Sequence, residues 1–299
     1  HPLGAGLLAR RTPDPDPEPT PDPVPTDPAI GHFALVMLPG GGAEQTLARR
    51  ATAHAADTAP TYLSALQPLA GKGTVVSGFA QSWPSGFANR IALLTGLEPT
   101  DDMKAGCETK VPALSDPSAA KPTGCIASTV TSGDIASTLE QSAAQLGDAA
   151  RVYVDAAGTV DPASLCRTPV PGDEFTLPSD GTPPSVDDPL LWMEPVNRDK
   201  GLCFDGTKGA IRPLSALKAD LAAAAAADTA DPLNSPHFAH LIMIVPSRCR
   251  TDVAIECPDG SAGGPEALAR FVDASLVKGL LASPAFATDG ALVTAWDRP

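Results

Sequence analysis

The sequence predicts an α/β fold in which a mostly parallel sheet carries helices on both faces. Two observations lead to this prediction. Short apolar runs recur along the chain, and they lack the alternation of polar and apolar residues that marks a half-exposed strand. Segments with helical character separate the runs, which is the order expected of parallel strands joined by crossover helices.

Five apolar runs are predicted to form the strands, and they cover residues 33–38, 74–79, 151–154, 241–245 and 291–296. Helices are predicted between them, over residues 43–54, 61–69, 87–95, 132–146, 214–227 and 265–281. The last segment has the clearest amphipathic spacing, with Leu268, Phe271, Val272 and Leu276 on one stripe. Strands and helices therefore alternate from residue 31 to the end of the chain.

The composition and charge of the chain indicate which classes of partner it can bind and where it is located. The chain has 299 residues with 43% hydrophobic residues and a formal net charge of −14. An acidic protein repels nucleic acid and anionic lipid on average, so we expect no nucleic-acid partner. The chain begins at His1 rather than Met. We therefore expect an export signal or a membrane anchor upstream of residue 1.

The first 30 residues are predicted to lie outside the fold. Residues 12–28 read TPDPDPEPTPDPVPTDP, with proline at nearly every second position and acids between. Proline removes backbone donors, so neither a helix nor a sheet is expected there. Residues 1–30 are interpreted either as an acidic proline-rich tether or as a disordered tail, and residues 31–299 as one α/β domain.

Six cysteines suggest an oxidising compartment. An even number without a C-x-x-C motif disfavours zinc and redox sites. Fifteen pairings are open, and pairing neighbours in sequence gives Cys107–Cys125, Cys166–Cys203 and Cys249–Cys257. Six buried free thiols are the alternative. Disulfides imply an extracytoplasmic location. Residues 101–125 and 156–212, rich in proline, glycine and aspartate, are interpreted as long crosslinked surface insertions.

Several segments, in order, resemble the bacterial phosphoesterase family, which includes secreted acid phosphatases and phospholipase C-type enzymes of the alkaline-phosphatase-like superfamily. GHFALVMLPGG at 31–41 resembles its opening strand, and FAQSWPSGFANRIALLTG at 79–96 its nucleophile segment. VPSRCRTDVAIEC at 245–257 resembles its segment with an H-D-G-H-D cluster, and LASPAF at 281–286 and VTAWD at 293–297 resemble its last landmarks. The resemblance implies an alkaline-phosphatase-like fold.

The same resemblance implies that the catalytic groups have been replaced. The family's acid and Asn after the first strand correspond to Pro39 and Gly40, and its H-D-G-H-D cluster to residues 250–254. Ser85, or Gly86 in an ungapped match, takes the position of the nucleophile, with Asn89 as a retained polar neighbour. Asp297 is the one acid that survives. A single carboxylate is too few ligands for a divalent cation, so we expect no metal and no other cofactor.

Three functions follow as hypotheses. The first is an exported phosphoesterase-like pseudoenzyme, a binding or accessory component of the cell envelope with a protein partner, for example in a membrane protein complex. The second is an active phosphoesterase with a rearranged site that uses Ser85, Asp297 and Asp252. The third is a metal-free binder of a phosphorylated ligand, held by Arg250 and Arg298. His32, which matches a family histidine, is interpreted as a structural residue.

Overall fold

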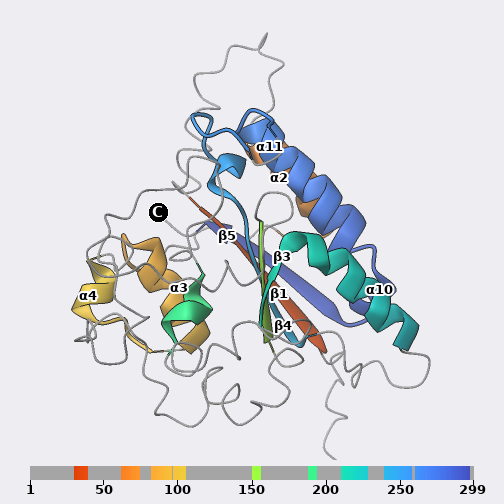
Figure 1. Ribbon diagram of the computed structural model, residues 1–299, viewed down its shortest axis with the longest axis horizontal. Coiled ribbons are helices and arrows are strands. Elements are labelled where there is room, and N and C mark those ends of the chain that lie inside the picture. The colour runs from red at the N-terminus through yellow and green to blue at the C-terminus, as the bar shows by residue number, and fades with distance from the viewer. Residues whose placement is uncertain are drawn as a thin grey trace, which may run out of the picture.

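The computed structural model describes residues 30–39, 62–74, 82–95, 97–105, 150–155, 188–193, 210–227, 239–257 and 260–296. These residues form an α/β fold with a five-stranded, wholly parallel sheet in the order β3-β2-β4-β1-β5 (Figure 1). The strands are β1 (His32–Leu38), β2 (Ala150–Val154), β3 (Ile211–Pro213), β4 (Leu241–Val245) and β5 (Gly290–Trp296). The predicted α/β class with its parallel sheet is confirmed.

Helices cover both faces of the sheet (Figure 1). One face packs against α2 (Tyr62–Ala70), α10 (Leu217–Ala227), α11 (Pro265–Phe271), η8 (Val272–Leu280) and α12 (Pro284–Ala287). The opposite face packs against α3 (Gly86–Thr95), α4 (Asp101–Lys104) and η4 (Pro189–Trp192). Neighbouring residues of β1 divide between the faces: Val36 packs with the first group and Met37 with the second. This explains why the strands read as continuous apolar runs.

For four strands and four helices the predicted bounds are close to the observed bounds. Strand β3 was not predicted. Ile211 and Arg212 fall at the end of the segment interpreted as a surface insertion, yet Ile211 is fully buried. In the same segment Leu190, Trp192 and Met193 are buried against α3 and the sheet. These two pieces therefore belong to the core. Most of the predicted strand 74–79 and all of helices 43–54 and 132–146 lie outside the described residues.

The long C-terminal helix changes its winding. Its first part is α-helical, and Val272–Leu280 forms a π-helix with wider turns. Buried Leu268, Val272, Leu276 and Leu280 are each four residues apart. A step of four residues is slightly more than one turn of an α-helix and slightly less than one turn of a π-helix. The apolar stripe therefore rotates around the helix axis in one direction along the α-helical part and in the opposite direction along the π-helical part. The change keeps all four side chains against the sheet.

A buried charge network joins α10 to the sheet. The Asp220 carboxylate accepts hydrogen bonds from the Tyr153 hydroxyl (2.7 Å) and from Arg212 Nη1 (2.6 Å), and Arg151 Nη1 lies 3.2 Å from it. Only 7% of Asp220 and 5% of Arg151 is exposed. Burial, followed by the negative charge of Asp220, raises the pKa of the Tyr153 hydroxyl well above its ordinary value.

We expect the raised pKa of Tyr153 to make the protein less stable in alkali. In the unfolded chain the phenol ionises near pH 10, whereas in the folded chain it stays protonated. Above about pH 10 the unfolded state therefore binds fewer protons, and the free energy of unfolding should fall by about 1.4 kcal/mol per pH unit. Urea unfolding of the wild type and of Tyr153→Phe at pH 8 and pH 11 measures this. A loss equally large in the variant would contradict the assignment.

Candidate functional site

The carboxyl ends of β2 and β4 are the place where this sheet favours a ligand site. The chain passes from β2 to β3 at one edge of the sheet and from β4 to β5 at the other. The connections after these two neighbouring strands therefore diverge, and ligands of open parallel sheets bind where this happens. Asp155 follows β2 directly, and residues 246–251 follow β4. These segments form the candidate site.

Asp155 is the central charged group of the candidate site. Its carboxylate accepts hydrogen bonds from Arg250 Nε at 2.8 Å and from Arg250 Nη2 at 3.3 Å, one on each oxygen. The backbone N–H of Ser247 also donates to it at 3.2 Å. Asp155 is 6% exposed. A guanidinium fork on a buried carboxylate is a strong, directional contact, so the charge of Asp155 is neutralised within the protein.

Arg250 is held in this position by further contacts. Its Nη1 donates to the carbonyl oxygen of Ala267 at 3.4 Å, and its Cζ lies 5.9 Å from the centre of the Phe271 ring. Both partners belong to α11. The guanidinium thus bridges β2 and the long helix. This supports a structural role for Arg250 more than its role as one half of a phosphate clamp, because its donors already have partners inside the protein.

Thr251 ties the ends of β1 and β4 to helix α2. Its hydroxyl donates to the carbonyl oxygen of Pro39, and its own carbonyl accepts from the Tyr62 hydroxyl at 2.6 Å. The Tyr62 ring meets the Trp296 ring edge-on at 6.1 Å. Pro39, where the family resemblance implies an acid, therefore contributes a backbone carbonyl that is already hydrogen-bonded. Gly40 lies outside the described residues.

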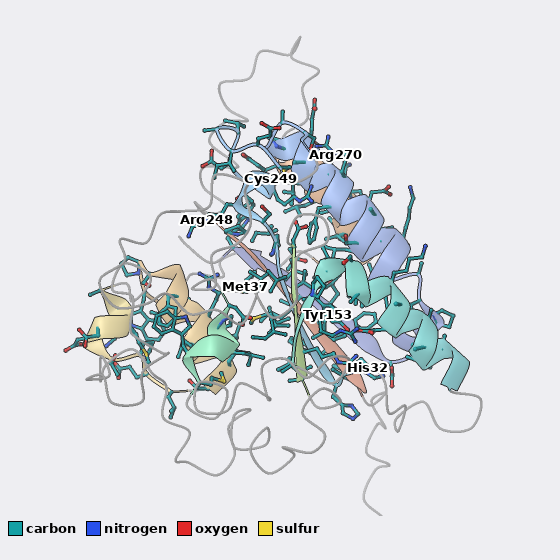
Figure 2. All side chains as sticks on the ribbon, viewed as in Figure 1. His32, Met37, Tyr153, Arg248, Cys249 and Arg270 are labelled. Atoms are coloured by element: carbon teal, nitrogen blue, oxygen red, sulfur yellow. A yellow bond between two sulfur atoms is a disulfide. The ribbon has the colours of Figure 1, made fainter. Side chains whose placement is uncertain are left out.

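A disulfide braces the segment after β4. Cys249 and Cys257 are bonded, with both residues buried, and this predicted pair is confirmed. The Gly264 N–H donates to the Cys249 carbonyl at 2.7 Å. A Cβ on Gly263 would lie only 2.2–2.8 Å from three backbone carbonyl oxygens, so the loop closes tightly around this glycine. Figure 2 shows Cys249 and Arg248 at the carboxyl end of the sheet, far from His32.

Removing this disulfide should destabilise the protein moderately. The bridge spans a sequence separation of 8 residues, for which loop-closure entropy predicts a loss of about 2–3 kcal/mol. Cys249→Ala with Cys257→Ala is the suitable double variant, because alanine, unlike serine, adds no hydroxyl group to these buried sites. Urea unfolding of the variant and the wild type, both without reductant, measures the difference. Equal unfolding midpoints would show that the bridge adds no stability.

Ser85 and Asn89 lie together at the start of α3, and both have structural partners. Ser85 precedes α3, and its Oγ accepts a hydrogen bond from the Ala88 N–H at 3.2 Å, which caps the helix. The Asn89 side-chain amide donates to the carbonyls of Trp83 (2.7 Å) and Ser85 (3.0 Å) and accepts from the Trp83 N–H (3.2 Å). Asn89 therefore fixes the turn that carries Ser85, and the Ser85 residue is 8% exposed.

The other sequence-predicted site residues are placed as follows. Asp252 Oδ1 accepts from the Ala254 N–H at 2.9 Å on the exposed side of the disulfide loop. His32 lies at the amino end of β1, where its Nδ1 is 3.1 Å from the Ala239 carbonyl and its ring stacks on His240. It is thus at the opposite end of the sheet from the candidate site. Asp297, Arg298, Cys107, Cys125, Cys166 and Cys203 lie outside the described residues.

Sequence reasoning missed Asp155, although a signal for it was present. An acid placed directly after a buried strand of a parallel sheet lies at the carboxyl edge, where ligand sites gather. The family resemblance, by contrast, places the expected acids in other segments of the chain. Among the described residues, no three His, Cys, Asp or Glu side chains are grouped in a way that could hold a metal ion.

Comparison with known proteins does not identify the chain: no protein-family model, curated protein or solved structure matches it. The part of the chain described by the structure contains no helix long and apolar enough to cross a membrane.

Proposed function

We propose that this chain is an exported, phosphoesterase-like pseudoenzyme that acts as a binding or accessory component of the cell envelope. The proposal includes an alkaline-phosphatase-like fold with disulfide-linked insertions and an extracytoplasmic location with a protein partner. Its support comes from the ordered sequence landmarks, the parallel sheet with helices on both faces, and the Cys249–Cys257 bridge. A disulfide is typical of exported proteins.

The Asp155–Arg250 pair is the observation that carries the proposal. Metal-dependent phosphoryl transfer needs carboxylates that are free to hold a cation beside the substrate. At the diverging ends of β2 and β4 the buried carboxylate instead holds a guanidinium in a two-pronged contact. Arg250 corresponds by the family resemblance to the first position of the H-D-G-H-D cluster. A positive side chain there repels a divalent cation from Asp155 and supplies the charge that a cation would supply.

The arrangement of Ser85 also fits a protein that does not hydrolyse phosphoesters. An attacking hydroxyl needs a base, or a metal, to activate it. The Ser85 hydroxyl oxygen accepts a hydrogen bond from the Ala88 backbone N–H of the helix that it caps, and the neighbouring Asn89 is not a base. The rival hypothesis of a rearranged site uses Ser85 with Asp297 and Asp252. Asp297 lies outside the described residues, and Asp252 lies on the exposed disulfide loop, where its carboxylate accepts a hydrogen bond from the Ala254 backbone N–H.

A hydrolysis assay tests the proposal. We expect the purified chain to hydrolyse p-nitrophenyl phosphate and bis-p-nitrophenyl phosphate no faster than buffer, with or without added Mg²⁺, Mn²⁺, Zn²⁺ or Ca²⁺. The reason is that charge stabilisation by a cation and an activated hydroxyl provides most of the rate in such enzymes. Ser85→Ala is the matched control and should behave like the wild type. A turnover number of about 1 s⁻¹ or more that disappears in Ser85→Ala would establish the active-enzyme alternative.

A further inference from the structure

No further inference is drawn: the strongest candidate, the outer edge of strand β5, is uncharged and leaves Val293 42% exposed, and it carries nothing because nothing in the described part of the structure shows what covers it.

Discussion

Replacing Asp220 by leucine is expected to lower the free energy of unfolding by about 3–5 kcal/mol, the largest effect of any single substitution considered. The Asp220 carboxylate is the shared partner of two guanidiniums and one phenol between the sheet and α10. Leucine would fit an apolar environment, but it would leave the buried positive charge of Arg151 and the partly buried charge of Arg212 without this carboxylate. Burying such a charge costs more than the lost hydrogen bonds alone.

Two further variants separate charge from shape at this position. Asp220→Asn keeps the size of the side chain and an acceptor for the Tyr153 hydroxyl but removes the negative charge, so it should lose most of the same stability. Lys218→Ala changes an exposed charge two residues away on the same helix and should alter stability by no more than about 0.5 kcal/mol. Urea unfolding followed by circular dichroism measures all three. A loss below about 1 kcal/mol in Asp220→Leu would show that the network contributes little.

Replacing Arg250 by methionine is expected to cost about 3 kcal/mol. Methionine retains much of the apolar stem, which can still pack on Phe271, but it leaves the buried Asp155 carboxylate with only the Ser247 N–H among its observed donors. An unpaired buried carboxylate is strongly destabilising. Arg250→Lys should fall between the two proteins, because lysine keeps the positive charge but cannot form the two-pronged contact.

Arg270→Met is the matched control for Arg250→Met. Arg270 lies on the long helix that Arg250 contacts, and it donates to Ser261 Oγ at 2.6 Å, but it is exposed. Its removal should cost less than about 1 kcal/mol, because exposed contacts of this kind are weak. If Arg250→Met and Arg270→Met lower the free energy of unfolding equally, the contact between Arg250 and Asp155 contributes no more than an exposed contact does. If Arg250→Met also gains metal-dependent hydrolysis, the guanidinium has been suppressing a functional cation site, and the proposed function would need revision.

Local sequence pattern predicted four of the five strands and the longer described helices, but it was misleading for parts of the core. The segment containing Leu190 and Trp192 was interpreted as a surface insertion because proline, glycine and aspartate dominate it, although four consecutive apolar residues, Leu190 to Met193, lie within it. Strand β3 was missed for a related reason. It has only three residues and ends in Pro213, so it offers too short a run to show a strand period, and its pairing with β2 supplies the structure.

By itself, the sequence determined the α/β class, the parallel character of the sheet and the approximate bounds of β1, β2, β4 and β5, because continuous apolar runs and helical periodicity are local properties. Only the tertiary structure decided the strand order, and with it the meeting of Asp155 with Arg250, 95 residues later, and of Arg151 with Asp220. Each charged side chain is compatible with many partners when the chain is extended. Burial between particular neighbouring strands and helices leaves few partners within reach, and the cost of an unpaired buried charge then makes pairing with them necessary.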